Sequence, residues 1–143
     1  MHSILDLSNS SEWNNYLNRL PIEQQDVYYT PEYYSLYQNN GDGIAYCFVF
    51  EKGNDIALYP FLMNSVNDLG YKLAKPYFDI QGAYGYNGVV SSSFEKIFID
   101  GFYQEFNSYC EQQNIIAEFN YLDTNNKPLF EYTIEVEDCN KIK

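Results

Sequence analysis

The sequence predicts one α/β (α+β) domain, residues 1–143, with a central sheet covered by helices on both faces. A chain of 143 residues has the usual size of a domain with a single hydrophobic core. Segments with helical and with strand-like patterns alternate along it. In the segment 44–50 both alternating sets of side chains are apolar, which is typical of a strand buried on both faces.

The first forty residues predict two helices. Apolar residues recur at helical spacing over 9–20, and Pro21 ends this segment. The piece 26–29 is expected to be extended. Thr30 can cap a second helix over 31–38, which has proline at its first position.

Two strands follow and are expected to form an antiparallel hairpin. A turn signal at 51–55 separates the strand over 44–50 from a return strand over 56–63. Pro60 has no N–H group, so we expect the return strand to be an edge strand, to contain a bulge, or to splay from its neighbour at that point. A ligand can insert at such an opening.

The second half of the chain predicts one long helix and further strands. An extended segment is expected near 71–75. An S-x-x-E capping box, Ser92 to Glu95, opens a helix that runs to about Gln113 and carries one apolar stripe. The segment 115–119 has the composition of a buried strand, and 130–136 is expected to be one more.

Composition restricts the classes of partner. The net charge is −12 with only 8 Lys and Arg residues, so the chain repels a polyphosphate and we expect no direct nucleic-acid binding. The three cysteines lack metal-ligand spacing, and the single histidine, His2, is expected to lie at a frayed terminus, so we expect no metal site. Cysteine usage suits a reducing compartment. With no signal peptide and no segment of membrane-spanning length, we expect a cytoplasmic protein without a membrane partner.

Several stretches resemble the amino-terminal half of FemAB-like N-acyltransferases of the GNAT superfamily. They are Asp26 to Tyr34, then Tyr59-Pro60-Phe61, then Asp79-Ile80 with Tyr84-Gly85-Tyr86-Asn87-Gly88, and finally Glu118-Phe119. The resemblance covers about residues 13–119, and 79–88 is its most specific part. It implies a mixed, mostly antiparallel sheet with helices on both faces. It also implies transfer of an acyl group from acetyl-CoA, another acyl-CoA or a charged tRNA to an amine, often on a sugar nucleotide or cell-wall precursor.

The sequence departs from this family in its last segment, 120–143. Similar proteins carry an Arg-Phe-His-Pro-like run after the Glu-Phe pair, whereas this chain has residues 120–124 without a basic side chain. The family has roughly twice this length, and its donor site belongs mainly to the second half. We therefore expect the chain to be truncated or incomplete alone, with the donor site supplied by a missing half or by a second copy in a homodimer.

The resemblance also implies the roles of individual residues. In a GNAT-type reaction a carboxylate removes the proton of the amine and a tyrosine protonates the leaving thiolate. Glu118 and Asp79 are the candidate catalytic carboxyls, and burial would raise the pKa of Glu118 towards that of a base. The candidate acceptor-binding residues are Tyr28, Tyr29, Tyr84, Gly85, Tyr86 and Asn87.

Each assignment has a simpler alternative. The segment 84–88 is also consistent with an ordinary turn that packs its tyrosines, and the two carboxyls with acceptors for backbone amides of loops. The sequence therefore leaves three functions open. They are the acceptor-binding half of an N-acyltransferase, a non-catalytic binding or interaction module that has kept the fold, and an unrelated α/β protein with a tyrosine-rich core.

Overall fold

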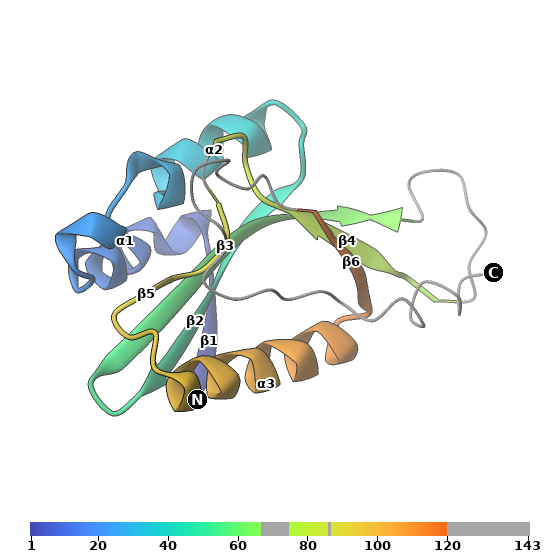
Figure 1. Cartoon of the computed structure of the whole chain (residues 1–143). Helices are drawn as coiled ribbons and strands as arrows, with labels where there is room; N and C mark the ends of the chain where they lie inside the picture. The colour runs from blue at the N-terminus through green and yellow to red at the C-terminus, as the bar shows by residue number, and fades with distance from the viewer. Residues whose placement is uncertain (67–74, 86, 120–143) are drawn as a thin grey trace.

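A computed structural model of the chain describes residues 1–66, 75–85 and 87–119 (Figure 1). The helices are α1 (Ser10–Asn18), α2 (Pro31–Asn39) and α3 (Lys96–Gln112), with short 3₁₀ helices at Leu7–Asn9, Ile22–Gln24 and Val27–Tyr29. The strands are β1 (His2–Asp6), β2 (Ile44–Lys52), β3 (Asp55–Ser65), β4 (Phe78–Gln81), β5 (Val90–Ser91) and β6 (Ile115–Phe119).

The six strands form one mixed, mostly antiparallel sheet with helices on both faces. Its order is β1-β2-β3-β4-β6, with β5 also paired to β3. Helices α1 and α2 cover one face and α3 covers the other (Figure 1). The predicted α+β class is thereby confirmed.

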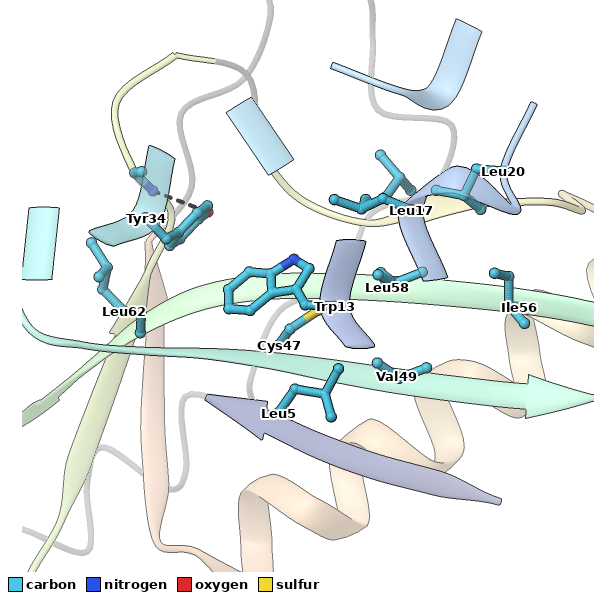
Figure 2. Close-up of a cluster of buried hydrophobic side chains, with 13 residues drawn as sticks. Leu5, Trp13, Leu17, Leu20, Tyr34, Cys47, Val49, Ile56, Leu58 and Leu62 are labelled. Carbon is cyan, nitrogen blue, oxygen red and sulfur yellow. Dashed lines mark hydrogen bonds between the residues drawn. The ribbon is translucent and has the colours of Figure 1, made fainter. Parts of the chain in front are cut away.

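A separate hydrophobic cluster fills the space on each face of the sheet. Strand β2 contributes to both clusters, because Ala45, Cys47 and Val49 point to the α1/α2 side and Tyr46, Phe48 and Phe50 point to the α3 side. On the α1/α2 side, Trp13 lies over β2 and β3 beside Cys47 (Figure 2). On the α3 side, aromatic rings dominate, and the Phe106 ring stacks on Tyr59 at 4.9 Å between centroids. This two-sided burial is the property that the sequence of β2 predicts.

The sheet splits beside Pro60. On the side away from β2, residues 57–58 of β3 pair with β5, and residues 62–65 pair with β4. Residues 59–61 lie between these two ladders and pair only with β2. The predicted splay at Pro60 is confirmed, since this residue cannot donate a ladder hydrogen bond.

Three local predictions are wrong. His2 is not frayed, because β1 pairs it with Phe50, its ring stacks on Phe48 at 4.9 Å, and its Nδ1 lies 2.8 Å from Glu105 Oε2. Residues 27–29 form a 3₁₀ turn rather than an extended piece, because the Asp26 carboxylate accepts a hydrogen bond from the Tyr28 backbone N–H.

The third error concerns the start of α3. The helix begins at Lys96 rather than at the predicted capping box, since the Ser92 hydroxyl oxygen instead accepts a hydrogen bond of 2.9 Å from the Ile56 backbone N–H. Of the extended segment expected near 71–75, residues 71–74 lie outside the described residues and Lys75 lies in a bend. The expected strand 130–136 and the divergent segment 120–143 also lie outside the described residues.

The described residues also bear on membranes and metals. Within 1–66, 75–85 and 87–119, no helix has both the length and the apolar character that a membrane span requires. The same ranges contain no group of three or more His, Cys, Asp or Glu side chains placed to hold a metal ion.

Candidate functional site

The loop after β4 lies against the residues that begin α2. Gly85 has φ +109°, and a Cβ at this position would lie 2.5 Å from the Tyr28 ring, so only glycine permits this contact. The Tyr33 hydroxyl donates a hydrogen bond to the backbone carbonyl of Tyr84. The structure therefore brings together Tyr28, Tyr84 and Gly85, three of the residues that the sequence assigns to acceptor binding.

Asn87 closes this loop on itself. Its Nδ2 donates to the Ala83 carbonyl at 2.9 Å, and its Oδ1 is buried without a hydrogen-bond partner among the described residues. Tyr86 lies outside the described residues. Tyr29 packs against the α1/α2 cluster, and its carbonyl accepts a hydrogen bond of 2.9 Å from Trp13 Nε1. Tyr29 is therefore part of the packing of the core.

The two candidate catalytic carboxyls lie on neighbouring strands but on opposite faces of the sheet. Asp79 of β4 pairs with Ala117 of β6, and the next residue, Ile80, pairs with Glu118. Side chains alternate along a strand, so consecutive positions face opposite ways. Ile80 belongs to the α3-side cluster, which places Glu118 on that side and Asp79 on the α2 side. The two carboxyls do not share one site.

Glu118 lies in a buried, tyrosine-containing environment under α3. Burial raises the pKa of Glu118 from 4.5 to about 7, and a hydrogen bond with the Tyr59 side chain opposes this rise. Burial also raises the pKa of the Cys110 thiol, and the charge of Glu118 raises it further. Glu118 thus has the pKa of a general base that works near neutral pH, as the sequence predicts for a buried position.

Tyr59 is a residue of this site to which the sequence alone gave no role. It lies in β3 directly before Pro60, at the split of the sheet, and belongs to the α3-side cluster. The signal that could have identified it is a hydroxyl-bearing side chain in an otherwise apolar strand, next to a proline that interrupts the ladder.

Asp79 has polar rather than aromatic neighbours. It pairs with Asn64 of β3, and its carboxyl is half-buried, which raises its pKa. The side chains of Asn64 and Gln81 both donate to the backbone carbonyl of Asp42, at 3.0 and 3.1 Å. This corner of the α2 side fixes the loop at 40–43 against the sheet.

The hydroxyl of Tyr34 bridges the split in the sheet. It donates to the Pro60 carbonyl at 3.3 Å and accepts a hydrogen bond of 3.2 Å from the Ala83 backbone N–H. The Tyr34 side chain is fully buried, and burial raises the pKa of its hydroxyl (Figure 2). Tyr34 thereby satisfies two backbone groups that the splayed strands leave without a ladder partner.

Replacing Tyr34 by phenylalanine is expected to lower the free energy of unfolding by about 2 kcal/mol, because the Pro60 carbonyl and the Ala83 N–H are then buried without partners. Urea denaturation measures the loss, and hydrogen exchange at Ala83 should become faster. Tyr16→Phe is the matched control, since the Tyr16 hydroxyl bonds Glu51 near the surface. Equal losses for the two variants would contradict the bridging role.

Two hollows in the described surface lie away from the loop and from Glu118. One, of about 350 Å³, lies where β2 begins and β3 ends, and its lining includes Tyr46, Met63 and Asn64. The other, of about 520 Å³, lies between the amino terminus and α3, and its lining includes Phe50 and Glu105. Neither is lined by Tyr28, Tyr84 or Glu118.

The fold and site together define an α+β domain with a glutamate–tyrosine pair on one face of a split sheet and a tyrosine-rich loop on the other. Comparisons with protein-family models, with curated proteins and with solved structures find no match for this chain. The resemblance to FemAB-like acyltransferases accordingly stays a prediction.

Proposed function

We propose that this chain is the acceptor-binding half of an N-acyltransferase, with Glu118 as its general base. The observation that carries the proposal is a carboxyl of pKa about 7, hydrogen-bonded to Tyr59, beside the split in the sheet. The mixed, mostly antiparallel sheet with helices on both faces also agrees with the fold that the resemblance implies.

The chemistry needs three proton transfers. Near neutral pH a carboxyl of pKa about 7 is partly ionised, so Glu118 can take a proton from the ammonium group of the acceptor. The freed amine then attacks the carbonyl carbon of an acyl thioester, the C–N bond forms and the C–S bond breaks. In this proposal Tyr59 protonates the leaving thiolate, and the second proton released by the acylated nitrogen restores the Tyr59 hydroxyl. Acetyl-CoA or another acyl-CoA is the proposed donor, held by a second half or a second copy.

The two faces of the sheet impose one requirement on this function. The loop with Tyr84 and Gly85 lies on the α2 side, whereas Glu118 lies on the α3 side. An acceptor held by the loop therefore reaches Glu118 only through the split beside Pro60, where the Tyr34 hydroxyl stands. Acyl transfer to an acceptor held there needs Tyr34 to move.

The proposal is tested by mixing the full chain, over a range of concentrations, with radiolabelled acetyl-CoA and a panel of primary amines that includes an amino sugar nucleotide. We expect transfer whose rate rises with pH through about 7, because ionised Glu118 is the base. Glu118→Gln should lower the rate about 100-fold or more. Glu111→Gln, a change at an exposed carboxyl of α3, is the control that should leave the rate unchanged.

The second candidate function is a non-catalytic interaction module. It is favoured by the Tyr34 hydroxyl, which bridges the split where a ligand would enter, and by the net charge of −12, which opposes binding of a phosphate-bearing donor. If calorimetric titration with acetyl-CoA gives no saturable heat and no amine is acylated at any protein concentration, the form of the proposal in which a second copy holds the donor is rejected, and the interaction module is favoured.

A further inference from the structure

Four tyrosines form one connected aromatic surface, which we call the tyrosine platform (Tyr28, Tyr33, Tyr37 and Tyr84). Tyr28 lies in the turn before α2, Tyr33 and Tyr37 lie on α2, and Tyr84 lies in the loop after β4. The Tyr28 and Tyr33 rings meet edge to face at 5.1 Å between centroids, and those of Tyr33 and Tyr37 lie 5.2 Å apart. The hydroxyls of Tyr33 and Tyr37 are 3.1 Å apart, and Tyr33 also donates to the Tyr84 carbonyl. These bonds hold the rings in fixed relative positions.

The platform borders exposed apolar side chains. The Tyr84 side chain is 69% exposed, and Leu36, between Tyr33 and Tyr37 on α2, is 63% exposed. Val27, directly before Tyr28, is exposed as well. Large apolar side chains that stay in water next to fixed aromatic rings are a feature of interaction surfaces.

The segments that build the platform carry charges of one sign. These segments, 22–43 and 80–90, contain four acidic residues and neither Lys nor Arg. The acidic residues are Glu23, Asp26, Glu32 and Asp42. Asp26 is next to the platform, because its carboxylate accepts a hydrogen bond from the Tyr28 backbone N–H at 3.2 Å. Tyrosine faces attract cations, and neighbouring carboxylates strengthen that preference.

We infer that the tyrosine platform is a docking surface for a basic, lysine-bearing segment of a partner protein. The acidic residues of the segments that build the platform favour a cationic partner. The open surface of the platform favours an extended segment over a small molecule. A small ligand needs an enclosing pocket for affinity, and neither hollow described above is lined by a platform residue. The platform shares Tyr28 and Tyr84 with the loop proposed to hold the acceptor, so this inference is an alternative use of that surface. It does not depend on Glu118, which lies on the opposite face of the sheet.

The test uses the full chain with ¹³C-labelled tyrosine rings, titrated with an acetylated, amidated peptide of alternating glycine and lysine. We expect saturable shifts of the platform rings and a saturable heat that weakens as salt is added. The same peptide with glutamine in place of lysine should not bind. Tyr84→Ala should weaken binding about fivefold, whereas Tyr84→Phe, which keeps the ring, should bind as the parent does.

Two further variants separate the platform from general charge attraction. Asp26→Asn keeps an oxygen that can accept from the Tyr28 N–H but removes the charge, and it should weaken binding and flatten the salt dependence. Ile97→Ala, an equally exposed apolar site on α3 at 76%, should have no effect. The inference is overturned if the lysine peptide gives no saturable signal, if Tyr84→Ala binds it as tightly as the parent, or if spermidine binds as tightly as the peptide.

Discussion

Trp13→Ala is expected to lower the free energy of unfolding by about 4 kcal/mol, the largest loss among the changes considered for this protein. The Trp13 side chain is fully buried and lies over β2 and β3 beside Tyr34, at 5.9 Å between ring centroids (Figure 2). Its removal leaves a cavity and deprives the Tyr29 carbonyl of the Nε1–H donor. Helix α1 then loses the main side chain that holds it on the sheet.

Urea denaturation followed by far-UV circular dichroism measures this loss, because Trp13 is the only tryptophan and its fluorescence disappears with it. Ile22→Ala is the control, since the exposed Ile22 side chain should contribute less than about 0.5 kcal/mol. If Trp13→Ala does not fold, Trp13→Phe gives a measurable intermediate loss. A loss below about 1.5 kcal/mol for Trp13→Ala would contradict the packing described for α1.

Glu118→Gln is expected to make the protein more stable at pH 8 by about 3 kcal/mol and to have little effect at pH 4.5. Burial raises the pKa of Glu118 from 4.5 in its unfolded reference to about 7. Between these values the folded state binds more protons than the unfolded state, so the stability of the parent falls as pH rises and the loss is complete above about pH 7. Glutamine cannot ionise and removes this penalty.

The measurement is the free energy of unfolding of parent and variant at several pH values from 4.5 to 8. Burial also raises the pKa of Asp79, but the contribution of this group cancels in the difference between the two proteins. Glu111→Gln is the control, because Glu111 is exposed on α3. Parallel pH curves for the parent and Glu118→Gln would show that Glu118 is not buried as described.

The effect of Glu118→Gln on stability and its effect on acyl transfer are measured separately. A stability curve that changes as expected, together with no acyl transfer, would leave a buried glutamate that acts only in the structure. Acyl transfer that Glu118→Gln removes, without the change in stability, would point to a more exposed catalytic carboxyl. Activity and stability together therefore decide between the acyltransferase and the interaction module.

Local sequence patterns predicted the structure correctly at positions where the backbone conformation depends on neighbouring residues. Helix α2 begins at Pro31 with its first turn capped by Thr30, whose hydroxyl accepts from the Tyr33 N–H, as predicted. Strands β2 and β3 form the expected hairpin, and the turn that joins them lies at 53–54, inside the predicted turn signal 51–55. Pro60 marks the split of the sheet because the missing N–H is a property of the residue itself.

Distant contacts caused two of the three failures. Ser92 follows the pattern of a capping residue, but its hydroxyl bonds Ile56 and Asp55 of β3 instead, so α3 starts later. The sequence of the short strand β1 carries little signal for a strand. The strand is held by pairing with β2 and by the contact of His2 with Glu105 of α3, more than one hundred residues away in sequence.

By itself, the sequence determined the α+β class, the two-sided burial of β2 and the opening at Pro60, because alternation, helical spacing and a missing N–H act locally. Only the tertiary structure decided that Asp79 and Glu118 face opposite sides. Their orientation depends on the register between β4 and β6, which includes a shift between Phe78 and Asp79. A displacement of one residue reverses the face of every side chain on a strand, and no local pattern fixes that register.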